Sequence, residues 1–333
     1  MHSISRRSLV VSAAAASAAF GLDKPLEFVG QAFAQGAGTH ANGSPAALIE
    51  KGFAKFTVGD IEVTQLYDGT FEKAHDPGFI KNASVDETKA ALKAAGMTDA
   101  YVPVPFTVTV VKMGGKTIMF DSGTGAQGAP TAGLIQKNDM LKKAGIDPAS
   151  ISTIIITHFH SDHIFGLMAK ETNAQVYPNA EIVMPVTEYK YWTDPGVIAK
   201  LPEARQGLAK RIQATFPTWK NLKQIEDGQD AIPGMRALAT YGHTPGHTSF
   251  VLGNGKLVVS GDVTNNHGLF ATNPGWQAQF DQDGAMAEAS RRKFFDRMIA
   301  DGATVTGYHW GMPGAGTIKK DGNGYALVPV TTV

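Results

Sequence analysis

The chain has 333 residues, of which 43% are hydrophobic and 18% are charged, and its formal net charge at pH 7 is zero. This length supports a substantial core, and this composition is typical of a globular enzyme and excludes a disordered chain. A net charge of zero gives no indication of a polyanionic partner such as nucleic acid, and no apolar run after residue 40 is long enough for stable membrane insertion. Because the chain contains no cysteine, disulfides and thiolate ligands are excluded.

Residues 1–34 predict a twin-arginine signal peptide. Arg6 and Arg7 lie in a stretch that matches such a signal, and an alanine-rich apolar segment follows over 11–22. Ala34 ends a small-x-small cleavage site. We therefore expect export to the periplasm or out of the cell, with a mature chain that begins near residue 35. A helical or disordered N-terminal extension is the alternative interpretation.

Residues 35–55 are rich in glycine, and we interpret them as a linker or loosely attached N-terminal arm. The folded domain is predicted over 56–333. Its first strand is Ile61–Leu66, in which apolar and polar residues alternate. Ser84 is a candidate helix cap, and the helix that it begins is expected to continue to residue 95, before a glycine.

A hairpin is predicted next, because two strand-like segments, Phe106–Met113 and Lys116–Asp121, flank a Gly-Gly pair. Met140–Ala144 is expected to close a further helix. Helical spacing with basic residues on the outside recurs over 202–214 and 284–300. These patterns by themselves indicate a mixed α and β chain.

The most informative segment follows Ile154–Thr157, a β-branched run that predicts a buried strand. Four metal-competent side chains fall within the next six residues, namely His158, His160, Asp162 and His163. Imidazole and carboxylate together suit zinc, iron, manganese or cobalt and make calcium a poor match. The alternative is a chance cluster of surface histidines, which this dense spacing disfavours.

Three further candidate ligands each follow a predicted strand. His243 comes after Met235–Tyr241, Asp262 ends a strand that starts at Lys256, and His309 follows an apolar segment from Ala303. Loops gather at strand ends, and functional sites are built there on a rigid scaffold. Each residue alone is more often a structural one, but their order along the chain points to a metal site.

This ordered set resembles the metallo-β-lactamase superfamily from Phe56 to the C-terminus. The resemblance implies an α+β (α/β) fold, the four-layer αββα sandwich, with Asp121 in a second shell that orients ligands. It implies two divalent ions, zinc first with iron, manganese or cobalt as alternatives. One ion would be held by His158, His160 and His243, and the other by Asp162, His163 and His309. Asp262 would bridge them together with a hydroxide, and Asp162 and Asp262 are the residues assigned to catalysis.

Within the superfamily, the chain looks most like the branch of methyl parathion hydrolase and quorum-quenching lactonases. The supporting segments are Leu66–Thr70, Gly242–Thr248 and the tail from Gly311 to Val330. Ser161 departs from the proline that this branch often carries, and Phe165 stands where many members have a smaller residue. The resemblance also implies a homodimer. A β-lactamase is disfavoured, because such enzymes often use a cysteine ligand.

The resemblance places a pocket tryptophan at Trp192, and further apolar walls are expected from Phe165, Phe270 and Trp310. Plain core packing is the alternative for each of these four residues. An aromatic pocket favours a small lipophilic substrate, namely a lactone, an ester or an aryl phosphotriester. The expected function is therefore an exported dinuclear metallohydrolase.

Three other functions stay open. A glyoxalase-type thioester hydrolase would need a basic cluster, for which Lys319 and Lys320 are candidates. A persulfide dioxygenase would use one iron and leave some ligands idle, whereas all seven ligand positions are filled here. A non-catalytic binder of metal or small molecules is the alternative from another class, although such members usually lose a ligand.

Overall fold

The computed structural model describes residues 38–127 and 131–333. The predicted signal peptide over 1–34 lies outside these ranges, as do residues 35–37 of the predicted arm. Within the described ranges, no helix combines the length and the apolar character that a membrane span requires.

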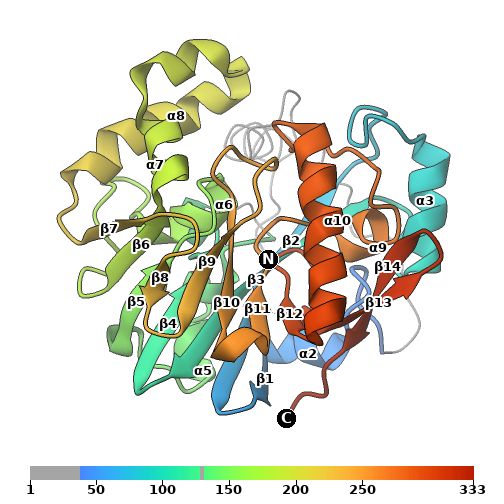
Figure 1. Ribbon diagram of the computed structural model, residues 1–333, viewed down its shortest axis with the longest axis horizontal. Coiled ribbons are helices and arrows are strands. Elements are labelled where there is room, and N and C mark those ends of the chain that lie inside the picture. Colours follow the sequence, from blue (N-terminus) through green and yellow to red (C-terminus); the bar gives the residue numbers. More distant parts are fainter. Residues whose placement is uncertain (1–37, 128–130) are drawn as a thin grey trace, which may run out of the picture.

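Two seven-stranded sheets form the centre of the molecule, and in each sheet the strands lie in the order in which they occur along the chain (Figure 1). The first sheet consists of β1 (Phe53–Val58), β2 (Ile61–Lys73), β3 (Val102–Met113), β4 (Lys116–Phe120), β5 (Ile151–Ile155), β6 (Glu181–Pro185) and β7 (Leu222–Ile225). The second consists of β8 (Asp230–Ile232), β9 (Met235–Ala239), β10 (Thr248–Leu252), β11 (Leu257–Val259), β12 (Thr304–Thr306), β13 (Ala315–Asp321) and β14 (Gly324–Pro329).

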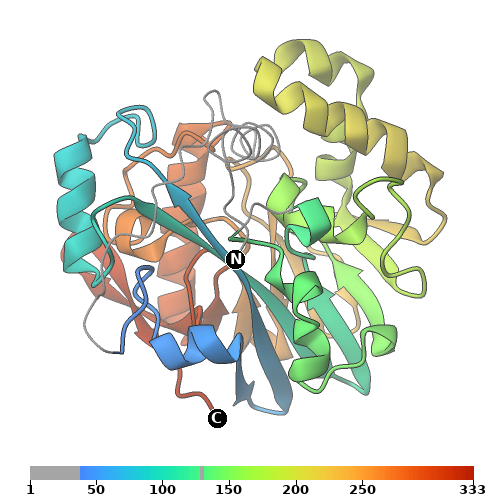
Figure 2. The ribbon, with the colours of Figure 1, turned by 180° about the vertical axis from the view of Figure 1, so that it is seen from behind.

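Helices cover the outer faces of the two sheets (Figures 1 and 2). Their bounds are α2 (Ala46–Lys51), α3 (Val85–Ala94), α4 (Leu134–Lys137), α5 (Met140–Lys143), α6 (Ser161–Ile164), α7 (Val186–Thr193), α8 (Glu203–Thr215), α9 (His267–Phe270) and α10 (Gly284–Asp301). One apolar cluster lies between the sheets, and a separate cluster lies on the outer face of each sheet. The predicted four-layer αββα sandwich is confirmed.

Side chains along a strand alternate between the two faces of the sheet, so each strand contributes to two apolar clusters. In β3, Val108 and Val110 pack against the outer helices, whereas Val111 packs between the sheets. The predicted hairpin is confirmed, because Met113 of β3 pairs with Lys116 of β4 in an antiparallel register. The two glycines between them have φ of 57° and 73°, the positive values that a tight hairpin turn requires.

Capping fixes the predicted helix after Ser84. The Ser84 side chain accepts a hydrogen bond from the backbone of Glu87, and the Glu87 carboxylate accepts one from the backbone of Ser84. This capping box satisfies backbone donors that a helix start leaves unpaired. The helices predicted over 202–214 and 284–300 are α8 and α10 in the structure.

The described part of the predicted arm is ordered structure rather than a loose linker. Residues 38–55 contain α2 and the beginning of β1, and Ser44 is buried. The Ser44 hydroxyl accepts a hydrogen bond from the backbone of Met312, near the other end of the chain. Glycines here serve turns, as Gly52 with φ of 79° ends α2. The structured region therefore begins before residue 56.

Candidate metal centre

The histidine-rich segment begins in the loop that follows β5 and continues into α6. After the strand, Thr157 donates a backbone hydrogen bond to Asp121 Oδ1 at 2.8 Å, and its hydroxyl donates to Asp121 Oδ2 at 2.8 Å. Because that hydroxyl proton is committed to Asp121, the Thr157 oxygen accepts the Nδ1 proton of His158 at 3.0 Å. His158 Nε2 is thereby left with a lone pair directed away from the strand.

The first ligand group consists of His158, His160 and His243. His160 Nδ1 lies 3.0 Å from His158 Nε2 and 2.9 Å from His243 Nε2. Three imidazole nitrogens therefore converge on one point, although His243 comes from the second half of the chain. Imidazole nitrogens in this arrangement suit a transition-metal ion such as zinc.

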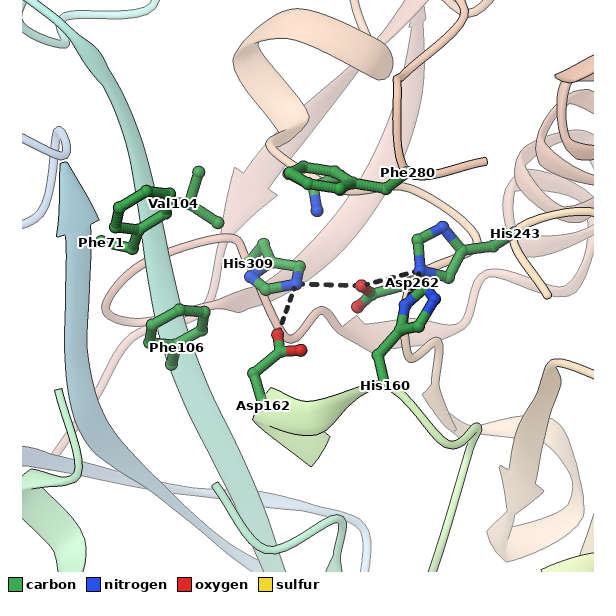
Figure 3. A pocket seen from close by; sticks show the side chains of 10 residues that line it. Phe71, Val104, Phe106, His160, Asp162, His243, Asp262, Phe280 and His309 are labelled. Carbon is green, nitrogen blue, oxygen red and sulfur yellow. Dashed lines mark hydrogen bonds and ion pairs between the residues drawn. The ribbon is translucent and has the colours of Figure 1, made fainter. Parts of the chain in front are cut away.

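The second ligand group consists of Asp162, His163 and His309. Asp162 Oδ2 lies 3.4 Å from the Nε2 atom of each of the two histidines. Figure 3 shows Asp162 and His309 facing the same space as His160 and His243. Both triads that the resemblance implied are thus assembled in the structure.

Asp262 lies between the two groups. Its Oδ2 atom is 3.4 Å from His243 Nε2 on one side, and 3.5 Å from His163 Nε2 and 2.9 Å from His309 Nε2 on the other. Asp262 Oδ1 and His163 Nε2 are buried and have no hydrogen-bond partner within the described residues. Burying a polar atom without a partner costs folding free energy, unless the atom coordinates an ion. The residues therefore fit a dinuclear centre with Asp262 as the shared ligand.

Burial controls the charge of these ligands. It lowers the pKa of His158 and of His160 well below the ordinary value, and the neighbouring histidines lower both further. Both imidazoles are therefore neutral at pH 7 and keep the lone pairs that metal binding needs. Burial alone would raise the pKa of Asp262, but His309 and His163 hold it well below its usual range, so this carboxylate is charged.

Hydrogen bonds to the Nδ1 atoms of the ligand histidines fix how the rings are turned. His163 donates to Asp121 Oδ2 at 2.7 Å, and His309 donates to the carbonyl of Pro105 at 2.8 Å. His243 Nδ1 lies 2.9 Å from a carboxylate oxygen of Asp281. Each bond places a proton on Nδ1 and directs Nε2 to the centre, which is the usual way in which proteins orient metal ligands.

Glu188 is a site residue that sequence reasoning missed. Its fully buried carboxylate accepts four hydrogen bonds, from Phe159 N (2.8 Å), Trp192 Nε1 (2.7 Å), Thr244 Oγ1 (2.7 Å) and Gly246 N (2.9 Å). The first and the last two donors belong to the loops that carry His160 and His243. An acidic residue one helical turn before a tryptophan is the only sequence signal, and it does not reveal these distant partners.

His247 lies beside the ligands but belongs to neither group. Its Nε2 accepts a hydrogen bond from the backbone N–H of Asp262 at 2.8 Å, and its Nδ1 faces Thr240. Burial lowers the pKa of His247 to about 3, so the ring is neutral. Because its one lone pair is already used, His247 supports the Asp262 loop rather than binding an ion.

A cavity of about 30 Å³ opens onto the two ligand groups. Apolar side chains from β2, from β3 and from the segment before α10 form its walls, and Asn265 adds an amide. Figure 3 shows Phe71, Val104 and Phe106 on one side and Phe280 on another. The lining is Phe71, Val104, Phe106, His160, Asp162, His243, Asp262, Asn265, Phe280 and His309.

The four aromatic residues predicted for the pocket do not line this cavity. Trp192 is fully buried and uses its indole N–H to bind Glu188. The guanidinium of Arg211 lies over the ring of Phe165, with its Cζ atom 4.5 Å from the ring centre. The sequence identified apolar side chains near the site but not the direction in which they point.

The other two predicted pocket residues lie in the packed core. Phe270 is fully buried against Phe79, and the two ring centres are 6.4 Å apart. Trp310 is buried next to Phe295, with ring centres 6.4 Å apart, and its indole N–H faces the carbonyl of Thr264. Core packing, the alternative considered from the sequence, therefore describes both residues.

Curated relatives match part of this chain. N-acyl homoserine lactonase from Bacillus sp is 27% identical over 158 residues, which cover 46% of this chain and 55% of the relative. The lactonase AttM from Agrobacterium fabrum is 29% identical over 148 residues, which cover 42% and 52% of the two chains. The chain thus matches about half the length of these curated relatives.

Solved structures match over a longer part of the chain. AidC, described as a dizinc quorum-quenching lactonase in complex with a product, superposes with a TM-score of 0.73 and 28% identity, covering 84% of this chain and 98% of AidC. AbOPH, described as a hydrolase in the beta-lactamase superfamily, superposes with a TM-score of 0.76 and 28% identity, covering 84% of this chain and 98% of AbOPH. The family model for the metallo-beta-lactamase superfamily matches residues 102–304, more than half of the chain. The chain therefore belongs to the metallo-beta-lactamase superfamily.

Proposed function

We propose that this protein is a dinuclear metal-dependent hydrolase that opens lactones or cleaves lipophilic esters. The observation that carries the proposal is the position of Asp262 between two complete ligand groups, beside a cavity with apolar walls. Two divalent ions held there, most simply zinc, would lower the pKa of water toward about 7 and polarise a carbonyl oxygen.

The residues of the chain itself would hold and orient the reactants. Asp162 and Asp262 line the cavity with carboxyl oxygens that can serve as ligands, and Asp262 keeps its charge because His309 and His163 lower its pKa. The Oδ1 atom of Asn265 accepts a hydrogen bond from the backbone N–H of Asn266 at 2.8 Å. The side-chain NH₂ group of Asn265 is therefore left to face the cavity. We expect one of them to donate to a carbonyl oxygen of the substrate.

The walls of the cavity favour an acyl or aryl group over a sugar or nucleotide. Phe71, Val104, Phe106 and Phe280 offer no hydrogen-bonding groups, so they match an apolar substituent beside the scissile bond. Named lactonases among the relatives support an N-acyl homoserine lactone as the first substrate to test. Aryl phosphotriesters are the second class, because paired ions also clamp phosphoryl oxygens and aromatic walls suit an aryl leaving group.

A matched substrate panel tests this proposal. Initial rates are measured on an acyl homoserine lactone, an aryl ester, an aryl phosphotriester, a thioester and a β-lactam, with the metal content of each sample determined by elemental analysis. We expect about two ions per chain and fastest turnover of the lactone or ester. Activity with one ion or none would contradict the dinuclear centre, and rapid β-lactam cleavage without lactone or ester turnover would contradict the substrate class.

The competing functions find less support in the site. All seven ligand positions converge on two groups, whereas a one-iron dioxygenase or a non-catalytic binder would leave some of them unused. The basic pair considered for a glutathione thioester lies on the exposed strand β13. There, Lys320 is already paired with Asp296 at 2.6 Å.

We also propose that the protein is exported to the periplasm or beyond, on the strength of Arg6, Arg7 and the small residues before position 35. Mass spectrometry of the protein from its native compartment should find a chain that begins near residue 35. Replacing both arginines with lysine should leave the precursor inside the cell. A full-length cytoplasmic form as the sole species would contradict export.

A further inference from the structure

We propose that Arg291 is a positioning residue that couples the orientation of the ligand His243 to the shape of the cavity wall. The proposal rests on the metal centre proposed above and adds a residue that neither binds an ion nor faces the cavity. Arg291 lies in the middle of α10, is 2% exposed, and is among the largest fully buried side chains of the described residues.

The guanidinium of Arg291 binds the segment between β11 and α10 at several points. Its Nε donates to the carbonyl of Val263 at 3.2 Å. Its Nη1 donates to the carbonyls of Pro274 and Trp276 at 2.8 and 3.1 Å. Its Nη2 donates to Asp281 Oδ2 at 3.2 Å. One side chain therefore holds the beginning, the middle and the end of this segment.

Each of these contacts leads to the candidate site. Val263 directly follows the shared ligand Asp262, so the bond to its carbonyl holds the backbone beside that ligand. Asp281 uses its other oxygen to bind His243 Nδ1 at 2.9 Å, which turns His243 Nε2 toward the first ligand group. Phe280, which lines the cavity, lies between Trp276 and Asp281 in the chain.

The chemistry of arginine explains why this residue type stands here. A guanidinium is always charged and presents five donors in a rigid planar fork, so it can bind several acceptors at fixed angles. A charge buried this deeply is costly unless it is paired and hydrogen-bonded. The partners of Arg291 meet that requirement, and its ion-pair partner Asp281 is also the orienting partner of a ligand.

Arg291→Met tests the proposal, with Arg292→Met as its matched control. Arg292 is the next residue of α10, but its side chain is 43% exposed and pairs with Glu288 one turn away. Zinc affinity of the metal-free proteins is measured by competition with a coloured chelator, without substrate. We expect Arg291→Met to weaken binding of one of the two ions by about 10–100-fold, the range for loss of an outer partner of a ligand. Arg292→Met should stay within about twofold of the wild type.

Two milder variants keep the test decisive if Arg291→Met does not fold. Asp281→Asn keeps the size of the side chain and the three carbonyl contacts of Arg291, and it should weaken zinc binding in the same site. Arg291→Lys keeps the charge but not the fork, so it should recover part of the affinity. Wild-type zinc affinity in folded Asp281→Asn and Arg291→Lys would overturn the proposal.

A kinetic readout tests the link to the cavity wall. In zinc-saturated Arg291→Lys, we expect KM for the best substrate of the panel to rise by more than kcat falls, because the Phe280 segment is no longer held by the fork. A fall in kcat with KM unchanged would overturn the link between Arg291 and the cavity wall. The zinc measurement uses no substrate, so it stands even if the proposed lactone or ester activity fails.

Discussion

The two halves of the sandwich build the metal centre in different ways. The first half supplies four of the seven candidate ligands from one short segment, which runs from the loop after β5 into α6. The second half supplies His243, Asp262 and His309 from three separate loops. In the first half, chain connectivity already brings the side chains near one another. In the second half, the ligands come from separate loops, so each has to be placed by bonds to residues outside its own loop.

Those distant bonds show what the second half requires. His309 is turned by the carbonyl of Pro105, and His243 is turned by Asp281. The backbone of Asp262 is held by His247. Local sequence therefore brings the first four ligands near one another, although Asp121 and Glu188 still hold their segment in place. A ligand on its own loop depends on such bonds for its position as well as its orientation. Mutations should separate these two cases.

The largest effect is expected from Asp262→Ala, which removes the one ligand that both groups share. Two cations would then lie close together without the carboxylate that offsets their repulsion. We expect loss or displacement of one ion and a fall in kcat of several orders of magnitude, since metal activation of water is the main catalytic contribution. Elemental analysis and initial rates on the same sample measure both effects. A variant with normal speed would refute the assigned role of Asp262.

Glu188→Gln should have the next largest effect, because Glu188 ties the loop of the first half to the His243 loop. Each carboxylate oxygen accepts two of the four hydrogen bonds, so the NH₂ group of an amide would face two donors whichever way it is turned. We expect about a 10–100-fold loss of activity or metal affinity. Activity, zinc competition and thermal unfolding should be compared with Glu288→Gln, a change on the surface of α10. Equal behaviour of the two variants would show that Glu188 does not hold the site.

A pair of aromatic variants tests the cavity wall. Phe280→Ala should raise KM for a lipophilic substrate by about tenfold, since lost apolar contacts reduce binding by roughly this amount. Trp192→Phe leaves the cavity lining intact but removes one donor to the buried Glu188. It should lower the free energy of unfolding by about 1–3 kcal/mol and leave KM nearly unchanged. The reverse pattern would restore Trp192 as the pocket residue that the sequence predicted.

His247 should make the stability of the protein depend on pH. Burial lowers the pKa of His247 from 6.5 to about 3, so the unfolded chain binds a proton there before the folded one does. The stability from neutral His247 is thus fully present above pH 6.5 and decreases as pH falls toward 3. Between pH 7 and pH 5 the decrease should be about 2 kcal/mol. His247→Gln should lose this part of the acid sensitivity in denaturant titrations at matched metal content, and an unchanged slope would contradict it.

Local patterns in the sequence indicated a mixed α and β chain, and the ordered ligand motifs, through their resemblance to the metallo-β-lactamase superfamily, implied the sandwich and the ligands that the structure brings together. Strand patterns around β3, β5 and β11, the Gly-Gly turn and the Ser84 cap are local signals, because they depend on side-chain alternation and backbone conformation. The box from His158 to His163 is equally local. The other three ligands, His243, Asp262 and His309, were identified by their order along the chain and their positions after predicted strands. Such positions lie close together because the strand ends of one fold meet at a common edge.

Only the tertiary structure decided which side chains face the cavity and which ones hold the ligands in place. Trp192 and Phe280 are both aromatic, but the first is turned into the core by Glu188 and the second lines the cavity. The roles of Glu188 and Arg291 could not be predicted locally, because most of their partners lie in loops that become neighbours only in the folded chain. A buried charge is defined by the groups that surround it, and those groups are brought together by folding rather than by sequence proximity.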